Sequence, residues 1–256
     1  MSGASEQAVV VGAGGAIGAY IVDALVDAGL RVVGVGRDAE RMAPLADRHG
    51  DRFIVCVADI ADDSSIETIR AALGALAAMP VAMVVHAPGV PVAGGVKAAA
   101  TQAVVEACNV KVAGFMRLVR AVEPKLRRGS RLVAIGGHYG FEPSPYAATA
   151  GVANAGLANV VRQMSWAYGG DGITSHLVAP GPADTERLRQ VVNHRAAAAG
   201  TDAETELAAL RSESAIGELT TPGQVAWAVR MLLAPEADAL AGSSLMLDSG
   251  RRRGMP

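Results

Sequence analysis

The sequence has few cysteines, few aromatic residues and little net charge. Its two cysteines, Cys56 and Cys108, lie far apart in apolar stretches of a 256-residue chain, which favours reduced, buried thiols over a disulfide framework or a metal site. Aromatic residues make up 4% of the chain and the formal charge is −2, so no surface for nucleic acid is expected. The one basic run, residues 251–253, is interpreted as a solvated tail.

Long hydrophobic runs and a secretory leader are also lacking. The most apolar stretch, residues 71–85, is rich in alanine and interrupted by Pro80, which is typical of a helix end followed by a buried strand. The opening residues MSGASEQ contain no positive region followed by an apolar core. We therefore expect a soluble, cytoplasmic protein with no membrane partner.

Short β-branched runs alternate along the chain with segments of helical length. The predicted strands are residues 8–11, 31–35, 53–57, 81–85, 131–135, 173–179 and 244–248. Their apolar residues hardly alternate with polar ones, as is typical of parallel strands covered on both faces. Glycines such as Gly29 and Gly50 mark helix ends. The pattern predicts an α/β fold with one doubly wound parallel sheet in a single domain, residues 1–256, with a substrate lid over residues 184–217.

A glycine-rich turn, VGAGGAIGAY, follows the first predicted strand. Glycines there let the backbone approach a pyrophosphate at the N-terminus of the next helix, although tight strand-to-helix turns use glycine for steric reasons too. Arg37 follows the second strand at a position where an arginine suits the 2′-phosphate of NADP(H) and a carboxylate would indicate NAD(H). Asp38 competes with this interpretation unless it caps the next helix.

With these features the whole chain resembles the short-chain dehydrogenase/reductase family. VADI stands at the adenine contact of that family, HAPG at its Asn-Asn-Ala-Gly position, and APGPADT at the turn whose threonine holds the nicotinamide carboxamide. Val11, Ala16, His86 and Pro88 depart from the family motifs. The resemblance implies a Rossmann-like fold of about seven strands. It also implies NADP(H) as cofactor, no metal, and cofactor contacts from Gly12, Gly14, Gly15, Ile17, Gly18, Arg37, Asp59, Ile60, Ala87, Gly89, Tyr146, Pro180, Gly181 and Thr185.

The catalytic positions depart further from the family, which uses an Asn, a Ser, a Tyr and a Lys four residues after the Tyr. SPYAATAG supplies Tyr146 but Ala150, Gly137 stands at the serine position before a shortened loop, and the asparagine position falls on Lys111. Reduction of a carbonyl needs a proton donor for its oxygen and a group that polarises it. We predict Tyr146 as the donor, Lys111 as the replacement for the missing lysine and His138 as the replacement for the serine.

Simpler alternatives exist for two of these residues. Lys111 lies in the apolar stripe of a long helix predicted for residues 101–126, where an ammonium must pair, border a cavity or extend its head to water. The simplest case is an ammonium that reaches water along the helix surface. His138, beside Gly137, is alternatively a turn residue.

Three functions remain open from the sequence. The first is an NADP(H)-dependent oxidoreductase that acts on a small carbonyl or alcohol through a rearranged site. The second is a catalytically impaired NADP-binding subunit that supports a partner, and the third is a non-redox reaction on the same scaffold. The family resemblance and the small residues of the predicted helix 146–168 favour a homotetramer, or a hetero-oligomer with another family member.

Overall fold

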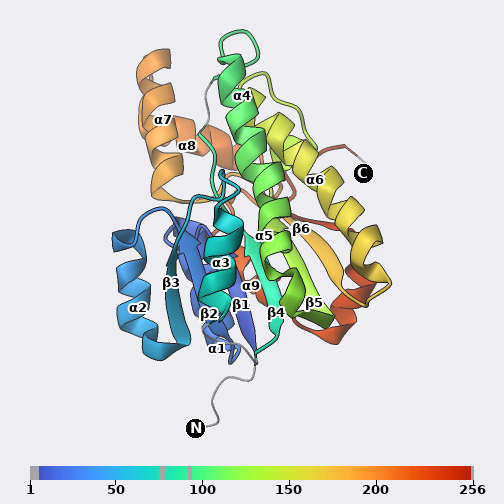
Figure 1. Ribbon diagram of the computed structural model, residues 1–256. Helices are drawn as coiled ribbons and strands as arrows, with labels where there is room; N and C mark the ends of the chain where they lie inside the picture. Colours follow the sequence, from blue (N-terminus) through green and yellow to red (C-terminus); the bar gives the residue numbers. More distant parts are fainter. Residues whose placement is uncertain (1–5, 75–78, 92–93, 255–256) are drawn as a thin grey trace.

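Seven parallel strands form one sheet in the computed structural model, which describes residues 6–74, 79–91 and 94–254 (Figure 1). The strand order is β3-β2-β1-β4-β5-β6-β7. The strands are β1 Gln7–Val11, β2 Arg31–Gly36, β3 Phe53–Val57, β4 Val81–His86, β5 Leu126–Ile135, β6 Thr174–Pro180 and β7 Ser244–Leu247. The predicted fold class and strands are confirmed, and only β5 differs from its prediction by more than one residue at an end.

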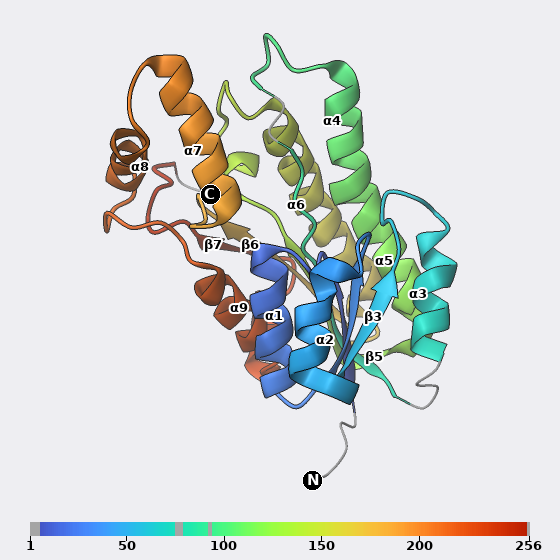
Figure 2. The ribbon, with the colours of Figure 1, turned by 90° about the vertical axis from the view of Figure 1, so that its left-hand side faces the viewer.

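Both faces of the sheet are covered by helices. The helices are α1 Ala16–Asp27, α2 Ala43–His49, α3 Ser65–Gly74, α4 Thr101–Cys108, α5 Gly114–Val122, α6 Ala148–Gly169, α7 Glu186–Ala199, α8 Ala203–Ser212 and α9 Pro222–Met231. Figure 2 shows α1 and α9 on one face and α3 and α5 on the other. Side chains of β1 alternate between two cores accordingly: Val10 packs with Ile21 of α1, and Val9 packs with Phe115 of α5. This double burial explains the continuous apolar strands in the sequence.

The long helix predicted for residues 101–126 is interrupted. α4 ends at Cys108, a π-helical turn spans Asn109–Ala113, and α5 begins at Gly114. A 3-10 turn, Glu123–Lys125, then ends the helix, and β5 starts at Leu126. A π turn accommodates one extra residue between two α-helical segments, and such turns occur frequently at functional sites. Lys111 lies in the middle of this turn.

The predicted lid consists of two helices, α7 and α8, which lie beyond the carboxyl ends of the strands (Figure 2). The side chains of Thr185 and Asp202 accept hydrogen bonds from backbone N–H groups at their N-termini. The two helices share a small apolar cluster of their own, which contains Val192, Leu210 and Leu219. They are therefore a separately packed unit over the edge of the sheet where ligands bind in this class of fold.

The basic run at residues 251–253 is not simply a solvated tail, as the sequence suggested. The Arg251 side chain is 10% exposed, donates a hydrogen bond to the Leu210 carbonyl and pairs with Glu213. It thereby fastens the end of α8 to the C-terminal segment. Within the described residues, no helix combines the length and apolar character needed to span a bilayer, and no group of His, Cys, Asp or Glu is arranged to hold a metal ion.

Candidate active site

The glycine turn between β1 and α1 forms a backbone cradle. Gly12 has φ 83°, and a Cβ at this position would lie 2.8 Å from the Ala87 carbonyl oxygen. Gly15 is the N-cap of α1, where no side chain accepts a hydrogen bond from the first N–H groups and no acidic residue lies in the first turn. These uncapped N–H groups and the positive end of the helix suit a pyrophosphate, so the turn fits a dinucleotide.

Arg37 and Asp38 take different roles at the end of β2. The Arg37 side chain is exposed and makes no hydrogen bond or ion pair with the described chain. Asp38 Oδ1 accepts a hydrogen bond of 2.9 Å from the Glu40 N–H, which turns its carboxylate toward the local backbone. Asp38 is not the N-cap of the following helix, since Ala39 precedes the 3-10 turn and Met42 precedes α2, each without a side-chain cap. The guanidinium of Arg37 remains available to a ligand.

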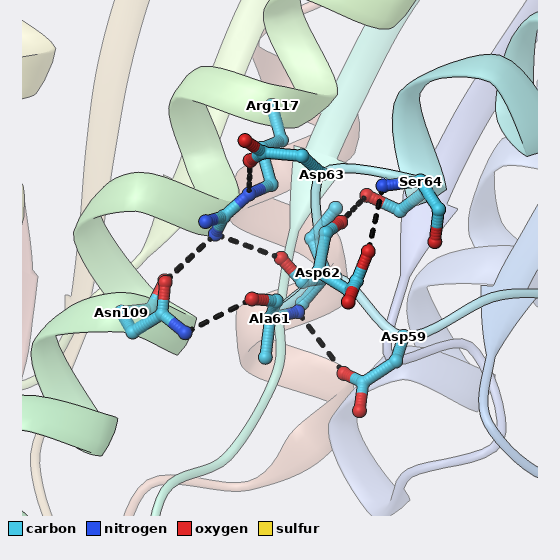
Figure 3. A network of polar contacts seen from close by, with 9 residues as sticks. Asp59, Ala61, Asp62, Asp63, Ser64, Asn109 and Arg117 are labelled. Carbon is cyan, nitrogen blue, oxygen red and sulfur yellow. Dashed lines mark hydrogen bonds and ion pairs between the residues drawn. The ribbon is translucent and has the colours of Figure 1, made fainter.

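The loop after β3, which contains Asp59 and Ile60, is held by one residue of α5 and one residue of the π turn before it (Figure 3). Arg117 of α5 donates to the Ile60 carbonyl at 3.2 Å and to Asn109 Oδ1 at 2.9 Å. Asn109 Nδ2 donates to the Ala61 carbonyl at 2.9 Å. Because Asn109 opens the π turn, this network connects the predicted adenosine loop to the turn that carries Lys111.

His86 ends β4 beneath the same π turn. Its ring is fully buried and its Nε2 lies 3.0 Å from the Val110 carbonyl oxygen. Because a carbonyl only accepts, Nε2 carries the hydrogen, and Nδ1 is left without a partner. Burial, with a smaller contribution from the charge of Lys111, lowers the pKa of His86 to about 3. His86 is therefore a neutral strand-end residue, followed by Ala87, whose N–H donates to the Val11 carbonyl.

Lys111 is a buried cation at the carboxyl end of β5. The residue is 6% exposed, and its Nζ donates a hydrogen bond of 2.7 Å to the Ile135 carbonyl. No described carboxylate pairs with it. Burial, followed by the charge of Arg187, lowers the pKa of Lys111 to about 8. The simpler interpretation, a lysine whose head reaches water, is therefore wrong.

His138 is also buried. It begins a 3-10 turn, His138–Gly140, immediately after Gly137, and its ring lies against Tyr139 with centroids 4.0 Å apart. Burial, with a further contribution from the charge of Arg251, lowers the pKa of His138 to about 4. The imidazole is thus neutral at pH 7, with a ring N–H that can donate a hydrogen bond.

Tyr146 does not lie on the helix that the sequence assigned to it. α6 begins at Ala148, after Ala147 in a non-helical conformation, and the Tyr146 side chain is 68% exposed. The preceding Pro145 carbonyl accepts a hydrogen bond from the Val96 N–H, which places this turn against the loop after β4. The expectation that Tyr146 and Ala150 share one helical face is therefore wrong. Within the described part of the chain, no hydrogen bond joins the Tyr146 hydroxyl to Lys111 or to His138.

Asn154, not Ala150, is the α6 side chain that lies against Gly137. A Cβ on Gly137 would lie 2.9 Å from Asn154 Nδ2. Asn154 is buried, and its Oδ1 has no hydrogen-bond partner. An unpartnered amide oxygen in a buried position is costly, so this atom is a candidate contact for a ligand.

The turn after β6 connects the sheet to α7. Pro180 ends β6, the Gly181 N–H donates to the Leu247 carbonyl, and the Thr185 hydroxyl accepts from the Leu188 N–H as the N-cap of α7. Two residues later, Arg187 reaches back across the cleft. Its guanidinium lies against Gly89 and donates to the Val90 carbonyl.

Sequence reasoning missed four side chains of this region: Arg187, Asn154, Asn109 and Arg117. Arg187 lies in a polar segment with several arginines, so its type carries no signal. Asn154 was detectable, because a polar amide interrupts the small and apolar residues of the predicted helix 146–168.

Comparison with known proteins agrees with this architecture. A family model described as enoyl-(acyl carrier protein) reductase matches residues 12–252. The chain belongs to the short-chain dehydrogenase/reductase family. Enzymes of this family are oxidoreductases that use NAD(P)(H) and act on small molecules. Family membership supports a dehydrogenase or reductase and determines neither the preferred dinucleotide nor the substrate.

Individual relatives are distant. An uncharacterised short-chain type dehydrogenase/reductase of Sinorhizobium fredii is 23% identical over 242 residues, which are 94% of this chain but 43% of that protein. A cis-4-hydroxycyclohexanecarboxylate dehydrogenase of Sinomonas cyclohexanicum is 28% identical over 254 residues, which are 96% of this chain and 96% of that protein. The structure of L-sorbose reductase from Gluconobacter frateurii, complexed with NADPH and L-sorbose, has a TM-score of 0.89 at 20% identity and covers 99% of both chains.

Proposed function

We propose that the protein is an NADP(H)-dependent oxidoreductase that interconverts a small carbonyl compound and its alcohol, with Lys111 exchanging the proton with the substrate oxygen. The observation that carries this proposal is the buried ammonium at the carboxyl end of β5, whose pKa of about 8 suits proton transfer near neutral pH. Relatives such as the cis-4-hydroxycyclohexanecarboxylate dehydrogenase are named for the oxidation of an alcohol.

Bound NADPH would supply the hydride in the direction of reduction. The Lys111 ammonium, oriented by the Ile135 carbonyl, donates its proton to the oxygen as the carbonyl becomes an alcohol, and the amine then regains a proton from water. The neutral imidazole of His138 donates a hydrogen bond to the same oxygen. Tyr146 takes no part in this scheme, because its ring is largely exposed and lies outside α6.

The preference for NADP(H) over NAD(H) rests on the end of β2. Arg37 is exposed and unpaired within the described chain, whereas the neighbouring carboxylate of Asp38 accepts a hydrogen bond from the Glu40 N–H. An arginine at this position binds a 2′-phosphate, and a carboxylate would bind the ribose hydroxyls of NAD(H). Arg37→Ala should therefore remove most of the difference between NADPH and NADH affinities in a fluorescence titration, and equal affinities in the parent protein would contradict the assignment.

A second candidate function is a cofactor-binding subunit without turnover of its own. Its support is the loss of two polar groups at the family's catalytic positions: Gly137 has no side chain, and Ala150 stands four residues after Tyr146. Self-association suits both candidates. Val105 of α4, with Val152 and Trp166 of α6, is exposed on the protomer, and we propose that these helices contribute to a homotetramer, which light scattering at micromolar concentration would test.

Comparing the turnover of the parent protein with that of Lys111→Met distinguishes the two candidates. The assay follows NADPH oxidation with a panel of ketones and quinones, and cofactor affinity is titrated separately. Lys111→Met should lower kcat at least about 100-fold without changing the NADPH affinity, since general acid catalysis contributes about 10²–10⁴-fold. Tyr146→Phe and the exposed Lys97→Met are the controls and should change kcat less than about 2-fold. A parent protein that binds NADPH but reduces no carbonyl, alone or with candidate partners, would favour the binding subunit.

A further inference from the structure

Arg187 lies at the cleft without an acidic partner. It reaches from α7 to the loop after β4, where its guanidinium donates to the Val90 carbonyl and lies against Gly89. By contrast, Arg189, two residues further along α7, pairs with Asp184. No described carboxylate pairs with Arg187, and the side chain is partly exposed. A planar guanidinium with one neutral partner retains donors for a further acceptor.

The nearest charge that Arg187 influences has the same sign. The guanidinium lowers the pKa of Lys111, and Arg187 is the one charged residue with that effect on Lys111. Two cations that border one cleft repel each other, and the cost is larger where one of them is buried. A bound anion at Arg187 would offset that repulsion.

The cofactor phosphates and the substrate are the two candidates for this anion. Arg187 lies against Gly89, two residues after Ala87, whose carbonyl lies beside Gly12 in the pyrophosphate turn. Lys111 lies farther from that turn, because it hydrogen-bonds to the end of β5 and β4 lies between β1 and β5 in the sheet. Adjacent strands are about 4.8 Å apart, so the ends of β1 and β5 are separated by about 10 Å. The unpartnered Oδ1 of the buried Asn154, beside Gly137, is a second observation that indicates a ligand in this part of the cleft.

From this arrangement we infer that Arg187 binds the carboxylate of the substrate, so that the protein acts on small oxo acids or hydroxy acids. The inference rests on the proposed function, because it names the substrate class for the same cleft. The guanidinium holds the carboxylate through paired N–H groups, which directs the carbonyl or alcohol carbon toward Lys111. Asn154 Oδ1 accepts a hydrogen bond from the substrate hydroxyl. The position of Arg187 on α7 makes the lid itself part of substrate recognition.

The test is calorimetric titration of protein saturated with NADP⁺, which does not depend on turnover. The probes are acetoacetate, pyruvate, levulinate and 4-hydroxybutanoate, each compared with its methyl ester. At least one acid should bind about 10-fold or more tightly than its ester, and Arg187→Met should abolish that difference, since a charge-assisted hydrogen bond is removed. Arg189→Met, the matched control on the same helix, should retain it.

Three outcomes would overturn the inference: equal affinities for acids and esters in the parent protein, no binding of any acid, or an unchanged preference in Arg187→Met. A loss of NADP⁺ affinity in Arg187→Met equal to its loss of acid affinity would also overturn it, because the residue would then belong to the cofactor site. The proposed function fails separately, when neither acids nor esters are turned over and Lys111→Met changes nothing.

Discussion

Replacing Lys111 by methionine should stabilise the protein at neutral pH. The folded state holds this ammonium almost out of contact with water, and its pKa falls from 10.5 to about 8. A difference of about 2.5 pKa units corresponds to about 3 kcal/mol of unfavourable free energy for the charged form. Methionine avoids that cost but loses the hydrogen bond to the Ile135 carbonyl, which is worth about 1 kcal/mol. The expected net gain is about 2 kcal/mol, a rise of roughly 4–8 °C in Tm for a domain of this size.

The gain should depend on pH in a defined direction. Below pH 8 the lysine is protonated in both the folded and the unfolded chain, so the full penalty applies to the parent protein. Between pH 8 and 10.5 the folded lysine is already neutral while the unfolded one still binds a proton, so the parent becomes more stable as the pH rises. The advantage of Lys111→Met should therefore shrink over this interval.

Urea unfolding of the parent, Lys111→Met and Lys97→Met at several pH values measures the effect. Differences between variants at one pH cancel the other titrating groups, and the exposed Lys97 controls for the loss of one positive charge. A Lys111→Met protein that is less stable than the parent at pH 7, or whose advantage is the same at pH 7 and pH 10, would refute the reasoning. Such a result would mean that the folded protein does not hold an uncompensated ammonium.

Three further predictions concern stability. Arg117→Met should cost about 2–3 kcal/mol in urea unfolding, because it leaves the carbonyl oxygen of the buried Ile60 and Oδ1 of the half-buried Asn109 without this partner. Asp63→Asn, at a pair whose carboxylate is 81% exposed, should cost less than about 1 kcal/mol, and equal costs would contradict this. Burial lowers the pKa values of three histidines, His86, His138 and His176. The free energy of unfolding should therefore fall as the pH drops below 6.5, and near pH 5 these groups should contribute a loss of about 4 kcal/mol per pH unit. A free energy of unfolding that does not change over this range would contradict the prediction. Arg251→Leu should accelerate limited proteolysis around α8 several-fold relative to Arg253→Leu, because it releases Leu210 and Glu213, and unchanged cleavage would exclude this anchoring role.

The sheet was predictable from the sequence because its strands are buried on both faces. Runs such as residues 81–85 are apolar throughout, and glycines with positive φ, such as Gly29 and Gly50, end the helices that separate the strands. The glycine-rich turn after β1 could be predicted equally well, because its backbone geometry requires glycine. Both predictions rest on local patterns with one structural solution.

The catalytic region was less predictable because its geometry depends on packing. The apolar stripe of residues 101–126 continues through the π turn, so periodicity gives no sign that the helix changes its hydrogen-bond pattern there. Tyr146 matched a short motif, but α6 has no side-chain cap at its start, and nothing local fixes where the helix begins. Burial of Lys111 was one of the alternatives suggested by its position in the apolar stripe. The contact of Arg187 with the loop after β4 could not be predicted in this way, because it joins residues that are distant in sequence.

The π turn contains one extra residue in the segment that carries Lys111 and Asn109, so a deletion there would move both side chains. One residue rotates a helix by about 100°, so excising a single residue from Asn109–Ala113 would let α4 and α5 join as one regular helix while both keep their contacts. Lys111 would then turn away from the end of β5, and Asn109 would leave the adenosine loop. A one-codon deletion is therefore a second route, beside the substitution of Lys111, by which the fold would be kept and its proposed chemistry lost.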